Sequence, residues 1–169
     1  FNRYPHAAIV LDADALTLLS EHAFALSHEK GSLVLTPHPS EAARLLGCTT
    51  ADIQKDRNQA ARQISGKYTA WTVLKGYQTV ICSPKSEITV NHTGNPGLST
   101  AGTGDVLAGM IGACLAQGIT PEQAIAGAVW LHGAAADYLV SQGIGPVGMT
   151  AGEVLEAARQ VRNLITVQA

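Results

Sequence analysis

Short apolar runs that alternate with helical stretches constrain the fold of this chain more than any other feature. Residues 7–11 and 32–36 are runs of mostly Ala, Val, Ile and Leu, the first ending before Asp12 and the second before Pro37. Such runs are typical of strands that are buried on both faces of a parallel sheet. Helical patterns follow them and recur at residues 14–19, 40–46, 49–64, 105–116, 121–140 and 150–164. The alternation predicts an α/β fold with a largely parallel central sheet flanked by helices.

The middle of the chain predicts a different kind of strand pairing. Residues 71–75 continue the apolar pattern, and Gly76-Tyr77 indicates a tight turn. Residues 78–82 and 87–91 are then two strand-like runs only a few residues apart, which we expect to pair as a hairpin at the sheet edge. Helix-capping boxes are expected at three places, with Gly47 ending the helix before the first of them. These pairs are Thr49/Asp52, Thr120/Gln123 and Thr150/Glu153.

Composition limits the class of protein and its partners. The 169 residues suit one domain, and the net charge of −2 with scattered Lys and Arg excludes a basic face for nucleic acid. No apolar run approaches the roughly 20 residues that span a bilayer, and no signal peptide is visible, so we expect no membrane contact and a cytoplasmic location. Cys48, Cys82 and Cys114 each lie among apolar residues, and we expect three buried, reduced thiols. The chain opens at Phe1 almost directly on a strand, so we expect an upstream part of the domain to be missing.

A glycine-rich run, Thr100-Ala101-Gly102-Thr103-Gly104-Asp105, precedes an apolar helix. A helix start has unpaired N–H groups and partial positive charge, and glycines let an anion approach the backbone, so the run predicts a phosphate site. It is neither a Walker A loop nor a Gly-x-Gly-x-x-Gly motif. Asp105 is then either a carboxylate that favours the helix dipole or a base that takes a proton from an attacking hydroxyl.

The same run carries a family resemblance. Residues 95–109, Asn-Pro-Gly-Leu-Ser-Thr-Ala-Gly-Thr-Gly-Asp-Val-Leu-Ala-Gly, closely resemble the signature of ADP/ATP-dependent NAD(P)H-hydrate dehydratases of the ribokinase-like superfamily. Three more segments agree in order: residues 11–16 (Leu-Asp-Ala-Asp-Ala-Leu), 35–41 (Leu-Thr-Pro-His-Pro-Ser-Glu) and 73–79 (Val-Leu-Lys-Gly-Tyr-Gln-Thr). The resemblance covers essentially the whole chain, and it implies a single ribokinase-like domain over residues 1–169 that lacks its N-terminal part.

The resemblance also implies an activity. Members of this family repair NADH or NADPH that has gained water at C6 of the nicotinamide ring. ADP in most bacterial members, or ATP, phosphorylates the hydroxyl with Mg²⁺, and phosphate then leaves as the double bond returns. The chain is therefore expected to be a lyase, a bacterial ADP-dependent hydro-lyase that acts in cofactor repair.

Site roles follow residue by residue from the resemblance. Asp105 corresponds to the base that contacts the hydrate, and His38 to a histidine that contacts the same dinucleotide. The expected nucleotide-binding residues are Lys75, Gly76, Tyr77, Gln78, Thr79, Gly102, Thr103 and Gly104. Glu41 is either a water-mediated Mg²⁺ contact or a helix-start carboxylate, and Asp12 is expected to organise its loop. The alternatives without a role in binding are a solvated lysine at position 75 and a histidine held for structural reasons at position 38. We expect His132 to be packed in the core.

Two alternatives stay open from the sequence. A vitamin-precursor kinase of the same superfamily shares the Gly-x-Gly-Asp loop and would release its phosphorylated alcohol. A nucleotide-binding module without activity would arise if the missing part forms one wall of the pocket. For an intact protein we expect a homo-oligomer, with a tetramer among the options.

Overall fold

Five strands and seven α-helices form the described part of the chain, which comprises residues 6–22 and 33–167 of this computed structural model. The strands are β1 (Ile9–Leu11), β2 (Leu33–Leu35), β3 (Trp71–Leu74), β4 (Val80–Cys82) and β5 (Ile88–Val90). The helices are α1 (Asp14–Glu21), α2 (Pro39–Leu46), α3 (Thr50–Lys55), α4 (Arg57–Tyr68), α5 (Thr103–Ala116), α6 (Pro121–Ser141) and α7 (Ala151–Val167). A 3₁₀ turn, η1 (Pro96–Ser99), precedes α5. Phe1 and Ser32 lie outside the described residues, and β1 begins at Ile9, two residues after the predicted start of the first strand.

The strands form one sheet in the order β1-β2-β3-β4-β5. Strands β1, β2 and β3 are parallel, with Val10 opposite Val34 and Leu35 opposite Thr72. Strands β4 and β5 run antiparallel to their neighbours, which confirms the hairpin at the edge. The sheet is therefore mixed, because the short β3–β4 turn cannot return the chain to a parallel strand without a crossover.

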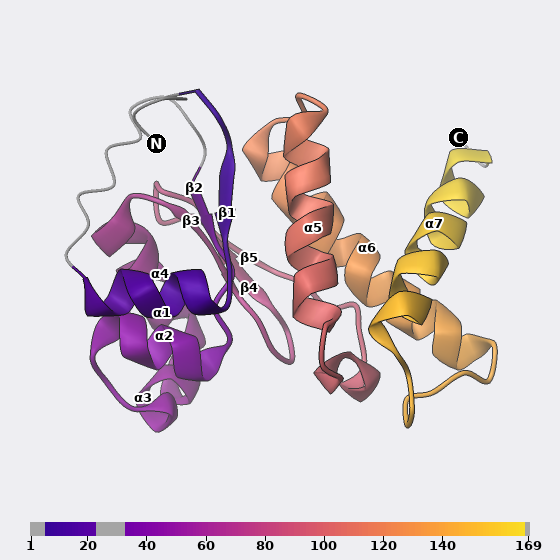
Figure 1. Cartoon of the computed structure of the whole chain (residues 1–169), viewed down its shortest axis with the longest axis horizontal. Helices are drawn as coiled ribbons and strands as arrows, with labels where there is room; N and C mark the ends of the chain where they lie inside the picture. The colour runs from indigo at the N-terminus through magenta and orange to yellow at the C-terminus, as the bar shows by residue number, and fades with distance from the viewer. Residues whose placement is uncertain (1–5, 23–32, 168–169) are drawn as a thin grey trace.

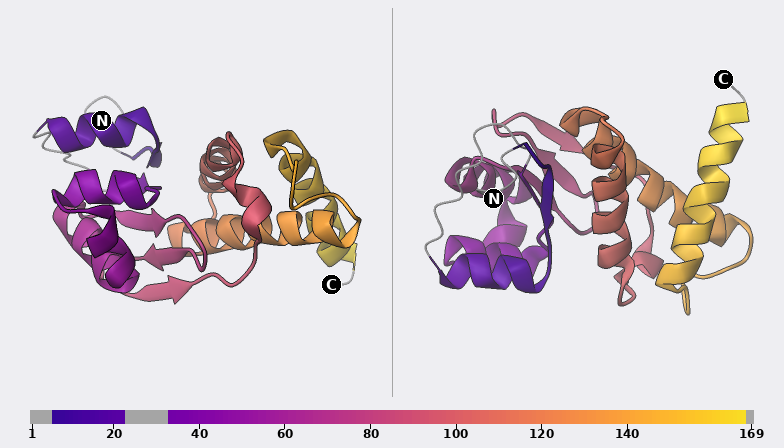
Figure 2. Two further views of the ribbon diagram at one scale, coloured as in Figure 1. Left: turned by 90° about the horizontal axis from the view of Figure 1, so that it is seen from below. Right: turned by 45° about the horizontal axis from the view of Figure 1, so that its top comes forward.

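Helices cover both faces of this sheet (Figure 1). Because side chains alternate along a strand, Leu33 and Leu35 point into a core with α1, α2, α3 and α4. Val34 points the other way, into a second core with Ile111 of α5 and Ile125 of α6. Helix α7 packs on α6 and not on the sheet, so the molecule extends away from the sheet at that end (Figure 2). The α/β class is as expected.

Two details of the helices differ from the prediction. The helix expected over 49–64 is two helices, because the carboxylate of Asp56 accepts the N–H of Gln59 at 2.9 Å and starts α4 as a cap. At α6, Thr120 does not cap with its side chain but donates its hydroxyl to the side-chain oxygen of Gln123 at 3.1 Å. The boxes at Thr49/Asp52 and Thr150/Glu153 are present as predicted.

The cysteine prediction was only partly correct. Cys82 is buried and Cys114 is half-buried, but Cys48 is exposed because it follows the left-handed Gly47 that ends α2. All three are free thiols. None of the helices in the described residues is long and apolar enough to cross a membrane.

Candidate active site

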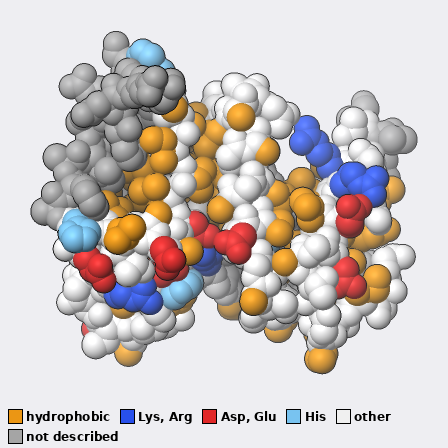
Figure 3. Space-filling model, viewed as in Figure 1, with side chains coloured by type: hydrophobic (Ala, Val, Ile, Leu, Met, Phe, Trp, Pro, Cys, Tyr) orange, Lys and Arg blue, Asp and Glu red, His pale blue; other side chains and the backbone are white. Residues whose placement is uncertain are grey.

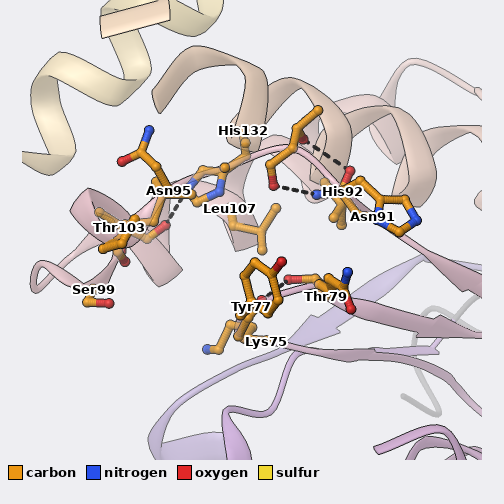
Figure 4. Close-up of a pocket in the computed structure, with 18 of the residues that line it drawn as sticks. Lys75, Tyr77, Thr79, Asn91, His92, Asn95, Ser99, Thr103, Leu107 and His132 are labelled. Atoms are coloured by element: carbon orange, nitrogen blue, oxygen red, sulfur yellow. Dashed lines mark hydrogen bonds between the residues drawn. The ribbon is translucent and has the colours of Figure 1, made fainter. Parts of the chain in front are cut away.

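A cavity of about 460 Å³ opens between the sheet and helices α5 and α6. One wall is the turn that joins β3 to β4, and the opposite wall is the loop that leaves β5 for η1 (Figure 4). Seven of the eight residues predicted to bind nucleotide line it: Lys75, Gly76, Tyr77, Gln78, Thr79, Thr103 and Gly104. Gly102 is not among the lining residues. Two segments far apart in the sequence thus share one cavity.

The start of α5 has the geometry of an anion site. Gly102 is its N-cap, with a φ of +86° that a residue with a side chain would rarely adopt. The N–H groups of Gly104 and Asp105 have no hydrogen-bond partner in the described part of the chain. Helix starts with free N–H groups bind phosphate. The hydroxyl of Thr103 is engaged instead with the carbonyl oxygens of Leu98 and Thr100, so this side chain shapes the loop.

Lys75 joins this cavity to a cluster of polar side chains outside it. Its ammonium lies 2.7 Å from a carboxylate oxygen of Asp12 and 3.9 Å from one of Glu41. A Cβ added at Gly104 would lie 3.3 Å from the same nitrogen, so Lys75 packs directly against the start of α5. Lys75 is therefore not a freely solvated lysine, and the Asp12 carboxylate is paired with Lys75 and makes no side-chain hydrogen bond to its own loop in the described part of the chain. Acidic, basic and histidine side chains gather between the lower ends of β1 and α5 on the face shown in Figure 3.

His38 and Glu41 together form the start of α2. The His38 Nδ1 atom accepts the N–H groups of Ser40 and Glu41 at 3.1 and 3.3 Å, and Glu41 accepts the N–H of His38 at 2.7 Å. The second Glu41 oxygen lies 3.3 Å from His38 Nε2. Because Nδ1 accepts, the neutral ring has its proton on Nε2. Both residues therefore have the structural role that the sequence offered as an alternative, while almost half of the His38 side chain stays exposed. Neither residue lines the cavity.

Asp105 lies in the first turn of α5 and is exposed. It does not line the cavity, but it follows Gly104, which does. Within residues 6–22 and 33–167 its carboxylate has neither a hydrogen bond nor an ion pair. A carboxylate in this position is free to accept a proton from a molecule that lies between Asp105 and the phosphate site.

His132 of α6 is buried, as predicted, but it also lines the cavity. Its Nε2 donates to the carbonyl oxygen of Thr103 at 2.9 Å (Figure 4). Burial, opposed by this hydrogen bond and aided by the nearby charge of Lys75, lowers the pKa of His132 to about 4. The ring is therefore neutral near pH 7.

The described residues contain no group of three or more His, Cys, Asp or Glu side chains that could hold a metal ion. Both oxygens of Glu41 already accept or face donors from His38 and Lys75. The donor set suits Mg²⁺ that enters with a nucleotide, since phosphate and water supply most of its ligands in such sites. A protein cage for Mg²⁺ is not formed by these side chains.

Comparison with known proteins then decides the family. The profile of NAD(P)H-hydrate dehydratase matches residues 2–160. The chain belongs to the NAD(P)H-hydrate dehydratase family. It is 51% identical over 160 residues to the ADP-dependent (S)-NAD(P)H-hydrate dehydratase of Neisseria meningitidis serogroup B, covering 94% of this chain and 54% of that protein. It is 47% identical over 156 residues to a bifunctional NAD(P)H-hydrate repair enzyme of Moorella thermoacetica, covering 92% of this chain and 29% of that protein.

Two solved structures agree with the fold. The ADP/ATP-dependent NAD(P)H-hydrate dehydratase of Bacillus subtilis, co-crystallised with ATP/Mg²⁺ and soaked with CoA, superimposes with a TM-score of 0.84 at 34% identity. The match covers 92% of this chain and 56% of that one. A ribokinase-like superfamily protein of Enterococcus faecalis gives a TM-score of 0.73 at 32% identity, over 90% of this chain and 52% of that one. The chain thus spans about half the length of the Neisseria and Bacillus dehydratases and less than a third of the bifunctional Moorella enzyme.

Sequence reasoning missed one whole wall of the cavity. Residues 91–96, together with Leu98, Ser99, Leu107, Val129, His132 and Gly133, complete the lining. Asn91 and Asn95 precede the glycine run in the sequence. Asn95 is a turn residue, because its side-chain oxygen accepts the N–H of Gly97 and starts η1. Two asparagines around a glycine-rich loop were the available signal.

Proposed function

We propose that the protein is an ADP-dependent (S)-NAD(P)H-hydrate dehydratase that acts in nicotinamide-cofactor repair. The observation that carries the proposal is the cavity in which residues 75–79 meet the start of α5. A relative at 51% identity has this activity by name, and a relative of the same fold was crystallised with ATP/Mg²⁺. Adenine nucleotide and the hydrate of NADH or NADPH are accordingly the proposed ligands, with Mg²⁺ bound to the phosphates.

The nucleotide binds in the cavity with its terminal phosphate at the start of α5. The free N–H groups of Gly104 and Asp105 and the positive end of the helix stabilise the transferring phosphoryl group. Lys75 lies against Gly104, and its ammonium offsets the charge of the phosphate. When phosphate binds, the ion pair between Lys75 and Asp12 is partly replaced. Gly76, with a φ of +139°, allows the turn backbone to approach the nucleotide.

The hydrate binds on the open side of α5, between Asp105 and the exposed ring of His38. Asp105 takes the proton of the C6 hydroxyl while the hydroxyl oxygen bonds to the terminal phosphorus. The bond from that phosphorus to the rest of the nucleotide breaks. Phosphate then leaves C6 with the bonding electrons as the neighbouring carbon loses a proton and the ring double bond returns. The exposed part of the His38 ring contacts the dinucleotide. Glu41 orients His38, and any contact with Mg²⁺ passes through water.

Replacing Asp105 with Asn tests the assignment of the base. The purified chain is supplied with hydrated NADH, ADP and Mg²⁺, and recovery of the dihydronicotinamide absorbance is followed. We expect turnover to fall by about 10²–10⁴-fold, as for loss of a general base, while calorimetry shows unchanged ADP binding. Glu122→Gln, which neutralises an exposed first-turn carboxylate of α6, is the matched control and retains full turnover.

Other outcomes identify the competing functions. Phosphorylation of a vitamin-precursor alcohol without recovery of NADH would replace the dehydratase with a kinase. ADP binding without turnover of either substrate would make the chain a nucleotide-binding module. Equal loss of ADP binding and turnover in Asp105→Asn would give that residue a structural role.

We also propose a homo-oligomer in the cytoplasm. Exposed apolar side chains on α6, α7 and the segment between them support the self-association, including Trp130 (41% exposed), Ile144 (40%) and Leu155 (52%). The three free thiols are consistent with a reducing compartment. Sedimentation velocity over a range of concentrations tests the assembly, and a monomer throughout would refute it.

A further inference from the structure

The carboxylate of Asp137 on α6 holds the loop that leads to the glycine run. Asp137 accepts the N–H of Gly94 at 2.8 Å through one oxygen and the side-chain amide of Asn95 at 3.0 Å through the other. Asn95 in turn accepts the N–H of Gly97 at 3.0 Å, which starts η1. Both carboxylate oxygens are thus committed to the segment that forms the missed wall of the cavity.

The hydrogen bonds continue from η1 to the start of α5 and return to α6. The Thr103 hydroxyl contacts the carbonyl oxygens of Leu98 and Thr100 at 2.7 and 2.8 Å, which links the end of η1 to the anion site. The Thr103 carbonyl oxygen then accepts from His132 of α6 at 2.9 Å. This series of hydrogen bonds therefore begins at Asp137 and ends at His132, and both residues are on α6.

The backbone of the loop also packs closely against α6 near His132. A Cβ added at Gly133 would lie 2.6 Å from the Thr93 carbonyl carbon, closer than real side chains approach. The Thr93 hydroxyl contacts the Trp130 carbonyl oxygen at 2.9 Å. Helix α6 thus serves as a rigid template for the loop, and a shift of the loop would be transmitted to the free N–H groups at Gly104.

We propose that Asp137 is a positioning residue for phosphoryl transfer, acting through Asn95 and Thr103 on the N–H groups at the start of α5. The proposal rests on the function proposed above. Asp137 is itself exposed, so its removal changes global stability little. Errors of about 1 Å in the placement of reacting groups cost about 10²-fold in rate, so the same removal has a large effect on turnover.

Asp137→Asn and Asn95→Asp provide a test that includes its own rescue. Asp137→Asn turns an amide toward the Asn95 amide, donor against donor, and Asn95→Asp sets two carboxylates against each other. The double variant restores every bond with the partners exchanged: Asn at 137 accepts from Gly94 and donates to Asp at 95, which accepts from Gly97. We expect each single variant to lower kcat by about 10–10²-fold, with unchanged ADP affinity in Asp137→Asn because Asp137 does not line the cavity, and the double variant to recover most of the loss of kcat.

The control and a second readout separate this proposal from the proposed function. Glu122→Gln, which removes an exposed carboxylate elsewhere on α6, retains the parental kcat. Hydrogen exchange of the Gly94 and Gly97 amides needs no turnover, and we expect about tenfold faster exchange in Asp137→Asn and recovery in the double variant. A parent without dehydratase activity would overturn the proposed function and leave amide exchange to test the contacts of Asp137. Unchanged exchange, kcat within twofold of the parent, or a double variant no better than the singles would overturn the role of Asp137.

Discussion

The buried imidazole of His132 makes a quantitative prediction about stability and pH. Burial holds its pKa at about 4, against 6.5 for an ordinary histidine. Between these two values the unfolded chain binds a proton that the folded chain does not bind, so the free energy of unfolding falls as the pH falls. At about 1.4 kcal/mol for each pH unit, the full window costs the folded state about 3 kcal/mol.

Replacing His132 with Gln isolates this contribution. Gln can still donate to the Thr103 carbonyl oxygen but does not titrate. We expect urea unfolding between pH 8 and pH 4 to show a flatter pH profile for the variant, with the difference from the parent appearing below about pH 6.5 and growing to about 3 kcal/mol near pH 4. His92→Gln, at an exposed histidine, is the control and follows the parental profile. Parallel profiles for the parent and the His132 variant would refute the argument.

Three further predictions concern the surroundings of the cavity. Gly104→Ala places a methyl group 3.3 Å from the Lys75 ammonium, so we expect ADP binding by calorimetry to weaken about tenfold, and an unchanged Kd would contradict the packing. His38→Asn retains an N-cap acceptor, so the unfolding midpoint should stay within a few degrees while KM for the hydrate rises; a parental KM would leave His38 with a structural role alone. Arg57→Lys loses the bond to the Leu74 carbonyl oxygen at 3.0 Å, and we expect about 1–2 kcal/mol less stability by urea unfolding, a loss that an equally stable variant would exclude.

Patterns of local sequence predicted most of the sheet and most helix ends. The strand β2 shows why, since Leu33, Val34 and Leu35 are all buried and face two different cores, which requires a continuous apolar run. The break at Asp56 escaped prediction because no Gly or Pro marks it. A side chain that caps α4 competes there with the helix backbone, and the competition depends on the final geometry.

For the site too, features that depend on neighbouring residues could be predicted, and features that depend on distant residues could not. Local backbone chemistry predicted an anion site at the glycine run, and the family resemblance pointed to residues 75–79; the structure brings both segments to one cavity. His132 could be predicted as buried from its apolar neighbours, but its contact with Thr103 joins residues 29 positions apart. Asp137 gave no signal, because its partners Gly94 and Asn95 lie more than 40 positions away.

The contact between Gly133 and Thr93 has a consequence for how this protein can diverge. The helix and the loop meet there without space for a side chain at 133, so substitutions at that position are tolerated only together with a displacement of the loop backbone. In a saturation mutagenesis library selected for ADP binding, position 133 should accept almost nothing. Gly127 lies earlier on the same helix and has no atom within 4 Å of an added Cβ, so that position should accept many residues. Tolerance of substitution at each position of α6 then depends on how close the loop backbone lies to that position, and not on helix propensity.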